Sequence, residues 1–176
     1  ATTIDHVTAE NGGKQAHLSD GSRLAVDQIM AATGRRPNTA NLGLDDLGVK
    51  LGKQGEIIVD DMSQTNLPSL YAIGDVTNRI NLTPVAIAEG HAFADSEFGN
   101  RPRKADHANV ASAVFSQPPI ASVGLSEADA INAHGKVTIF ESQFRAMKNT
   151  ISGRGEKTYM KLIVDAANDK VVGVHM

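Results

Sequence analysis

The run Ser69-Leu70-Tyr71-Ala72-Ile73-Gly74-Asp75-Val76-Thr77 is followed closely by Asn81-Leu82-Thr83-Pro84-Val85-Ala86-Ile87-Ala88. The first run predicts a buried strand that stops at a Gly-Asp. The second predicts a helix that opens with a Thr cap and has Pro at its first helical position. A carboxylate at a strand end accepts hydrogen bonds from sugar-like hydroxyls, and a helix N-terminus offers free N–H groups and partial positive charge. We therefore expect Asp75 and Thr83 to mark the site of a nucleotide cofactor.

Both elements also occur in domains that bind no ligand. In that alternative, Asp75 is an ordinary turn residue and Thr83 is a plain helix cap. Their succession in this order favours the cofactor site, because each element supplies a different part of the chemistry that a nucleotide needs.

Length and composition restrict the class of protein. The 176 residues are enough for one good core or two small ones, and their formal net charge is -3. This charge gives no electrostatic reason to expect nucleic acid or an anionic membrane as a partner. No apolar run approaches a membrane span and nothing resembles a signal peptide, so we expect a cytoplasmic or organellar setting and choose the cytoplasm.

The residues available for metal or thiol chemistry are few. The sequence has no cysteine, which excludes disulfides, thiolate metal sites and a cysteine nucleophile within this chain. Its six histidines are scattered without the helical spacing of a zinc site, so we expect no structural metal. They are His6, His17, His91, His107, His134 and His175.

The first part of the chain predicts a small antiparallel sheet. Residues 3–33 alternate apolar and polar side chains in three runs, separated by Asn11-Gly12-Gly13 and by Asp20-Gly21, both strong turn signals. We expect the last of these strands to cover residues 26–33. The polar run Gly34-Arg35-Arg36-Pro37-Asn38 follows, and a domain boundary near Pro37 is consistent with it.

The middle of the chain predicts mostly loop and one long helix. We expect a short helical turn over residues 42–49, a strand over residues 56–60 and a helix over residues 84–98 that stops at Gly99-Asn100. Six apolar side chains of this helix are available for burial. They are Val85, Ile87, Ala88, Ala92, Phe93 and Phe98.

A basic linker, residues 101–104, separates this helix from a different pattern. We expect a strand over residues 110–115, a rigid bend at Gln117-Pro118-Pro119 and a helix opened by Ser126 with Asp129 at the capping-box position. Three further strands follow, and together these elements predict an antiparallel α+β unit. Their expected ranges are 137–143, 157–164 and 170–175.

Four motifs give the chain a resemblance to the flavin-dependent pyridine-nucleotide disulfide oxidoreductases. The first two resemble the whole family, and the last two are similar to the glutathione reductases of plants and bacteria rather than to lipoamide dehydrogenases or mercuric reductases. The motifs are Ala32-Thr33-Gly34-Arg35-Arg36-Pro37-Asn38, the block from Ala72 to Ala86, Ala113-Val114-Phe115-Ser116-Gln117-Pro118-Pro119, and Met147-Lys148-Asn149-Thr150-Ile151-Ser152-Gly153-Arg154.

The resemblance implies an α/β and α+β fold. A partial FAD/NAD(P)-binding, Rossmann-like domain would be followed by a truncated antiparallel α+β dimerisation domain. Residues 1–37 would be the tail of the NADPH domain, 38–107 the central segment that completes the FAD domain, and 108–176 part of the interface domain. The resemblance covers only the middle and rear of a family member, so we expect a fragment whose Gly-rich fingerprints, redox cysteines and general-acid histidine lie elsewhere.

The resemblance also implies contacts with FAD and NADPH. Asp75 would bind the ribitol hydroxyls of FAD, and Thr83 would cap the helix that points at the pyrimidine end of the flavin. Gly34 would lie where the backbone closes on the nicotinamide nucleotide, with a turn glycine between two domains as the compatible alternative. Asn81 and Ala113 match positions near the nicotinamide, with contacts through backbone or shape.

For the substrate, the resemblance implies that His91 and Phe115 contact oxidised glutathione. His91 departs from the Arg that several family members carry, so its pairing with a substrate carboxylate would be weaker and pH-dependent. It is equally well explained as a surface helix residue, and Phe115 as a core residue. His175 lies within a strand pattern and does not match the family's general-acid histidine.

Two functions stay open from the sequence. In the first, the parent protein passes a hydride from NADPH to FAD and electrons onward to a disulfide, most readily oxidised glutathione, as a homodimer, while this chain alone is inactive because it has no thiols. A piece of a related reductase, such as trypanothione reductase or lipoamide dehydrogenase, belongs to the same class. In the second, the chain is a folded, non-catalytic fragment that associates through its interface sheet. The choice of NADPH over NADH cannot be read from these residues.

Overall fold

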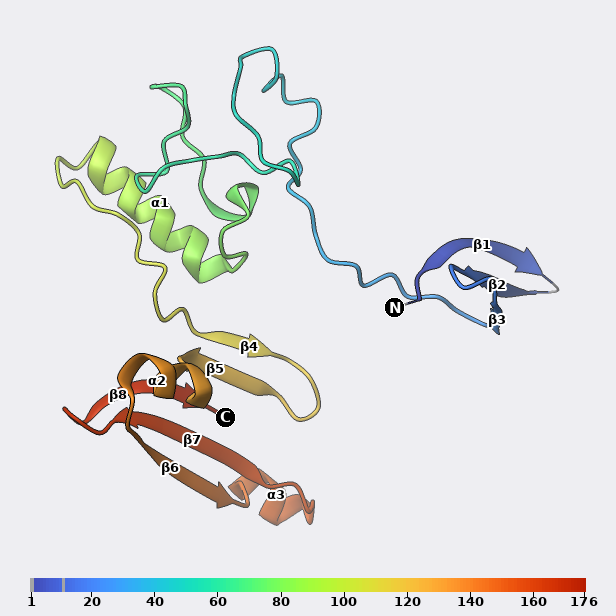
Figure 1. The fold of residues 1–176 in the computed structure, drawn as a ribbon, viewed down its shortest axis with the longest axis vertical. Helices are drawn as coiled ribbons and strands as arrows, with labels where there is room; N and C mark the ends of the chain where they lie inside the picture. The colour runs from blue at the N-terminus through green and yellow to red at the C-terminus, as the bar shows by residue number, and fades with distance from the viewer. Residues whose placement is uncertain (1, 11) are drawn as a thin grey trace. The chain divides into compact units, whose positions relative to one another are not determined.

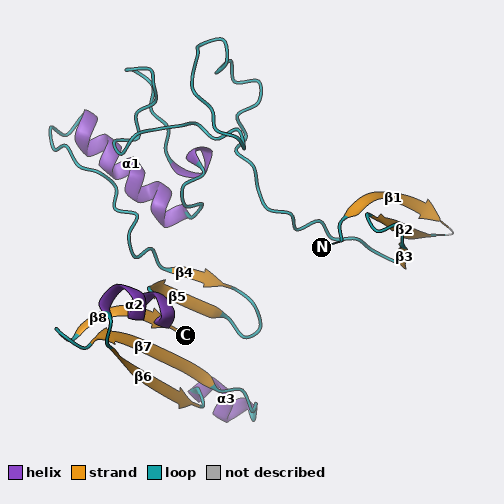
Figure 2. Cartoon of the chain, viewed as in Figure 1, coloured by secondary structure: helices purple, strands orange, loops and turns teal. Residues whose placement is uncertain are grey.

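The computed structural model describes residues 2–10 and 12–176, which form two compact units that divide between Arg36 and Pro37. Figures 1 and 2 show the order of the elements along the chain and their secondary structure. Helices and antiparallel sheets are mixed, which is the architecture that the sequence predicts.

The first unit is a three-stranded antiparallel sheet in the order β1-β2-β3. Its strands are β1 (Ile4–Glu10), β2 (Gly13–Leu18) and β3 (Arg23–Val26). The Asp20 carboxylate closes the β2–β3 turn by accepting the Ser22 N–H at 2.9 Å. The predicted turn residue Asn11 lies outside the described residues.

The expected strand over residues 26–33 is wrong, because β3 ends at Val26. Val26 pairs with Lys14, which is next to the first residue of β2, so the ladder has no partner for the residues that follow. Without a neighbouring strand, their apolar pattern does not produce a strand.

Residues 37–82 consist of turns around a small core with few regular elements. Val49, Ile57 and Ala72 are its buried residues, and Leu44, Leu51, Val59, Leu67, Leu70 and Val76 pack against them. The strands expected over 56–60 and up to Ile73 are reduced to isolated bridges, Leu51↔Ile57 and Gln64↔Tyr71. The reason is that backbone groups such as the Ile57 N–H bond to turns, here to the Val76 carbonyl at 3.0 Å, instead of to a continuous strand.

A short 3₁₀ helix, η1 (Gly74–Thr77), precedes α1 (Thr83–Glu97), and the two pack together. The helix is close to its predicted range, but its buried side chains differ from the prediction. Val85, Glu89 and Ala92 are buried, whereas Ile87 and Phe98 are 54% and 81% exposed. A glutamate therefore occupies the middle of the buried stripe that spacings of four and three residues define.

The C-terminal part of the second unit is a five-stranded antiparallel sheet in the order β4-β5-β8-β7-β6. The strands are β4 (Ser112–Val114), β5 (Ile120–Gly124), β6 (Val137–Phe144), β7 (Thr158–Asp165) and β8 (Lys170–His175). Helices α2 (Glu127–His134) and α3 (Met147–Ser152) connect them, and α2 packs on β6, β7 and β8. The predicted elements here are confirmed except that β5 and α3 were not expected.

Side-chain alternation sets the two faces of this sheet. Ile163 of β7 and Ala130 of α2 are fully buried. Phe140, Leu162 and Val174 are paired across β6, β7 and β8, and they belong to the opposite face. Phe140 is 55% exposed there, so one apolar face of the sheet lies open within the described chain.

Candidate functional site

The predicted site is built on the close packing of η1 against the first turn of α1. Gly74 has φ of +70°, and a Cβ at this position would lie 3.0 Å from the Cβ of Ala86. Both facts require glycine, since a side chain would strain the backbone and push the turn away from the helix. The Thr77 hydroxyl and the Asn78 N–H close the turn on the carbonyls of Gly74 and Asp75 at 2.8 and 3.0 Å.

Asp75 lies in this 3₁₀ turn and not at the end of a strand, so the expected strand end is wrong in form. The turn nevertheless leaves the side chain exposed. Among the described residues, no hydrogen bond or ion pair involves its carboxylate. An exposed carboxylate of this kind is available to accept hydrogen bonds from hydroxyl groups of a ligand.

The start of α1 also leaves a polar group without a partner within the described chain. The N-cap residue is Leu82, whose side chain has no polar group, and Thr83 is the first helical residue, so the capping role predicted for Thr83 is wrong. Pro84 has no N–H, and the N–H groups of Val85 and Ala86 bond to the Leu82 carbonyl at 3.0 and 3.1 Å. The Thr83 N–H has no acceptor in the described part of the chain, and it carries the partial positive charge of a helix start.

Asn81 lies between these two elements and helps to hold them. Its side-chain amide donates to the Asn78 Oδ1 at 3.1 Å, and Asn78 in turn donates to the Gln54 Oε1 at 3.1 Å. Asn78 has a left-handed backbone, which ends η1. The Asn81 side chain is thus committed to the loop, which agrees with a contribution through backbone and shape.

The sequence reasoning missed Glu89, which is 1% exposed. Its Oε2 accepts the Gly74 N–H at 2.6 Å. Its Oε1 pairs with Arg79 at 2.9 Å and with the Nε2 of His107 at 2.7 Å. The sequence did contain a signal for a buried charge at Glu89. A charged residue four positions after Val85 and three before Ala92 lies on the buried face of the helix, where it requires partners.

The basic segment after α1 is held against this part of the protein. Asp95 of α1 accepts from Arg101 at 2.6 Å and from Arg103 at 2.7 Å, and Arg101 is the main cause that lowers the pKa of Asp95. Lys104 bonds to Asp61 at 2.7 Å and lowers the pKa of that carboxyl. The segment predicted as a linker is therefore fastened at several points.

The other predicted residues lie elsewhere in the fold. Gly34 belongs to the first unit and has φ of +91° with no other atom within 4 Å of a Cβ built on it, which agrees with a turn glycine. His91 is an exposed residue of α1. Ala113 of β4 pairs with Ala121 of β5. Phe115 follows β4 and has 91% of its surface exposed, so the core alternative for Phe115 is wrong.

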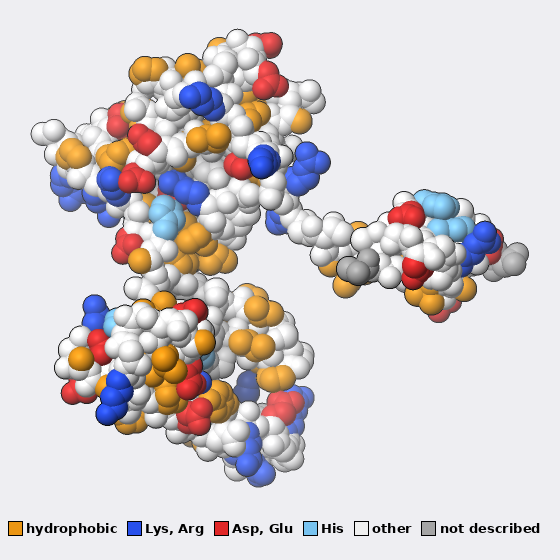
Figure 3. All heavy atoms as spheres, viewed as in Figure 1, with side chains coloured by type: hydrophobic (Ala, Val, Ile, Leu, Met, Phe, Trp, Pro, Cys, Tyr) orange, Lys and Arg blue, Asp and Glu red, His pale blue; other side chains and the backbone are white. Residues whose placement is uncertain are grey.

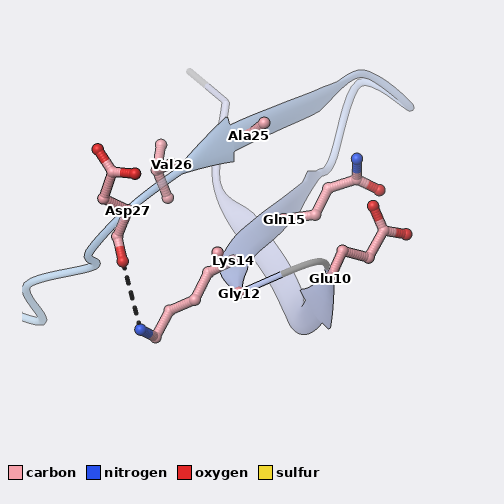
Figure 4. Close-up of a pocket in the computed structure, with 8 residues that line it drawn as sticks. Glu10, Gly12, Lys14, Gln15, Ala25, Val26 and Asp27 are labelled. Atoms are coloured by element: carbon pink, nitrogen blue, oxygen red, sulfur yellow. Dashed lines mark hydrogen bonds between the residues drawn. The ribbon is translucent and has the colours of Figure 1, made fainter.

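A hollow of about 480 Å³ lies in the first unit, on the hairpin of β2 and its neighbours (Figure 4). The Lys14 Nζ donates to the Asp27 carbonyl at 3.4 Å across its edge. It contains none of the predicted site residues. Within the described ranges, no three His, Asp or Glu side chains gather into a set suited to a metal ion. None of the helices there has the length and apolar character needed to cross a membrane.

Comparison with protein families matches both parts of the chain. The family profile described as pyridine nucleotide-disulphide oxidoreductase matches residues 1–90, and the dimerisation domain of the same family matches residues 110–176. This chain belongs to the pyridine nucleotide-disulphide oxidoreductases. The family resemblance predicted from the four motifs is confirmed.

Curated relatives narrow the similarity. The chain is 52% identical over 170 residues to a glutathione reductase of Burkholderia cepacia, covering 97% of this chain and 38% of that protein. It is 49% identical over 168 residues to a chloroplastic/mitochondrial glutathione reductase of Pisum sativum, with 96% and 30% covered. A trypanothione reductase of Trypanosoma congolense is 46% identical over 186 residues, with 100% and 38% covered.

Among solved structures, the chain is similar to the HOCl-induced flavoprotein disulfide reductase RclA from Escherichia coli, with a TM-score of 0.87 and 26% identity. The match covers 99% of this chain and 40% of that one. The chain therefore spans less than half the length of each of these relatives.

Proposed function

We propose that this chain supplies part of the FAD site of an NADPH-dependent disulfide reductase whose substrate is oxidised glutathione. The observation that carries the proposal is the exposed Asp75 carboxylate on a turn packed against the start of α1, where the Thr83 N–H is open. The names of three similar curated proteins, two glutathione reductases and one trypanothione reductase, support the substrate class.

The residues present fit a flavin nucleotide. Gly74 allows the turn to approach α1 so closely that a Cβ would fill the space, which brings a hydroxyl-accepting carboxylate and a helix start to neighbouring positions. We assign Asp75 to the ribitol hydroxyls and the first turn of α1 to the electron-rich pyrimidine edge. FAD, when bound, would accept a hydride and pass electrons to a disulfide.

The remaining predicted contacts belong to the same proposal. Gly34, Asn81 and Ala113 would lie along the nicotinamide nucleotide. His91 and Phe115 would face the disulfide substrate, and their exposure leaves them available for it. In this proposal, residues 1–37 would belong to the NADPH domain, residues 38–107 to the FAD domain and residues 108–176 to the interface domain.

The intact protein would act as a cytoplasmic homodimer. The matched dimerisation domain and the open apolar face that carries Phe140 and Leu162 support the association. The relative from Pisum sativum is named as chloroplastic/mitochondrial, and such an organelle is the alternative setting. This chain alone would not complete the cycle, since electron transfer to a disulfide needs thiols and the sequence contains no cysteine.

Two alternatives have specific support. The trypanothione reductase at 46% identity makes trypanothione disulfide the second candidate substrate. The exposed side chains of the sheet favour a second role, a folded fragment that associates without flavin, and Figure 3 shows hydrophobic side chains on the surface of the part that holds β4 and β5.

Titration of the purified chain with FAD, followed by visible absorbance and flavin fluorescence, tests the proposal. We expect saturable binding near one equivalent, weakened at least about tenfold by Asp75→Ala, since a carboxylate that accepts hydroxyl bonds contributes on the order of 1.5–3 kcal/mol. Asp46→Ala, an exposed carboxylate in the same segment, is the matched control. Equal affinity of the wild type and Asp75→Ala would contradict the assignment.

The same preparation tests the two roles of the chain. Reduction of oxidised glutathione by NADPH is expected to be absent, and measurable turnover by the pure chain would overturn the predicted inactivity. A dimer without flavin on size-exclusion chromatography with light scattering would favour the associating fragment. A clean monomer would count against association through the sheet.

A further inference from the structure

Glu89 gathers three groups that come from three different segments. Its two carboxylate oxygens bond to the Gly74 N–H in η1, to Arg79 in the following loop and to His107 beyond the basic segment. At 1% exposure its charge has almost no solvent, so its free energy depends on these partners.

The two oxygens of this carboxylate bind different partners. Oε2 holds the backbone of Gly74 itself, one residue before Asp75. Oε1 is shared between Arg79 and His107, which are 25% and 28% exposed and therefore less constrained by packing. Because one delocalised charge serves both oxygens, a change at His107 alters the acceptor strength at Gly74.

We propose that Glu89 is a positioning residue that couples His107 to the turn Gly74–Asp75 through this shared carboxylate. The orientation of the Asp75 carboxylate then depends on the bond between Glu89 and His107, which lies at the end of the segment after α1. This segment leads to the part of the chain matched by the dimerisation domain. The flavin consequence rests on the function proposed above, whereas the coupling itself does not.

A matched control is present on the same helix. Asp95 also binds this segment, through Arg101 and Arg103, but within the described residues its carboxylate makes no bond to η1. Asp95→Asn therefore loosens the same segment without removing a partner of Glu89. His107→Leu removes one partner of Glu89 without touching Gly74.

Amide hydrogen exchange, followed by NMR on the whole chain, tests the coupling. We expect Glu89→Gln to speed exchange of the Gly74 N–H about tenfold or more, and His107→Leu to speed it about threefold, relative to the N–H groups of Ile57 and Ala72. The reference amides bond within the same segment, to Val76 and Ser63 at 3.0 Å each. Asp95→Asn is expected to leave the ratio within twofold.

Equal acceleration of all three amides in the variants would show a merely structural role and overturn the proposal, as would an unchanged Gly74 N–H in His107→Leu. If Glu89→Gln does not fold, the comparison of His107→Leu with Asp95→Asn still decides.

FAD titration separates the two proposals. Weaker FAD binding by His107→Leu but not by Asp95→Asn extends the coupling to the cofactor. No FAD binding by the wild type refutes the FAD site, and the exchange result then tests the role of Glu89 by itself.

Discussion

Residues 37–107 contain one long helix and isolated bridges, whereas residues 108–176 contain a continuous antiparallel sheet. In the first region, side chains such as Glu89 and Asp60 satisfy backbone N–H groups of the turns. In the second, backbone pairing between β6, β7 and β8 satisfies them. A segment held by side chains can take an irregular path and present groups to a ligand, while a ladder of strands supplies a rigid surface.

The largest effect is expected in the sheet. Ile163→Ala removes a fully buried side chain and should lower the free energy of unfolding by about 3–4 kcal/mol, because the cavity cannot collapse between the sheet and α2. Urea unfolding followed by circular dichroism measures it. Ile151→Ala, 88% exposed on α3, should change stability by less than about 0.5 kcal/mol. Similar losses for the two variants would refute the core assigned to this sheet.

The second effect tests how much the ion pair between Arg79 and the buried Glu89 stabilises residues 37–107. Arg79→Leu leaves the buried Glu89 without its guanidinium partner and should cost about 3 kcal/mol, reduced somewhat by the 25% exposure of Arg79. Arg101→Leu removes a guanidinium that is 74% exposed and should cost less than about 1 kcal/mol. Urea unfolding measures both losses, and a larger loss for Arg101→Leu than for Arg79→Leu would contradict this prediction.

The third effect concerns the turn itself. Gly74→Ala forces a side chain into a positive φ and against Ala86 at 3.0 Å, so we expect a loss of about 2 kcal/mol. Gly155→Ala, where an added Cβ meets no atom within 4 Å, is the control and should be nearly neutral. Thermal unfolding of the two variants beside the wild type measures the difference. A neutral Gly74→Ala would mean that the turn moves freely against α1.

Helix starts in the two regions give a smaller contrast. The Ser126 hydroxyl accepts the Asp129 N–H at 3.2 Å, so Ser126→Ala should cost about 1 kcal/mol. Thr83 makes no such cap, and Thr83→Ala should cost less than about 0.3 kcal/mol. Equal losses measured by urea unfolding would show that Thr83 caps α1 in solution after all.

The last prediction concerns pH and the sheet. The Ala167 N–H is the main cause that lowers the pKa of Asp165 below 3.8, with the charge of His134 at 3.2 Å and the Asn168 amide adding to it. A carboxyl with a lowered pKa in the folded state adds stability above its unfolded pKa, and this contribution is lost as the pH falls through the folded value. The unfolding temperature of Asp165→Asn should therefore fall less steeply than that of the wild type below about pH 4. Parallel curves would refute this assignment.

Local patterns in the sequence predicted much of the fold. Alternation and turn residues located β1, β2 and the strands β6, β7 and β8, and the Ser126 cap located α2. The motifs around Gly74-Asp75 predicted the family. These features depend on neighbours in the sequence, since a strand's period of two and a helix cap need no distant partner.

Only the tertiary structure decided which apolar runs became strands and where the buried charge lay. Residues 27–33 and 56–60 have strand patterns but no partner strands, so they remain irregular beyond isolated bridges. Glu89 is 15 residues from Gly74 and 18 from His107 in the sequence, and its role follows from their meeting in space. A hydrogen bond between distant residues is fixed by packing, and for this reason the partners of this carboxylate could not be found from local spacing.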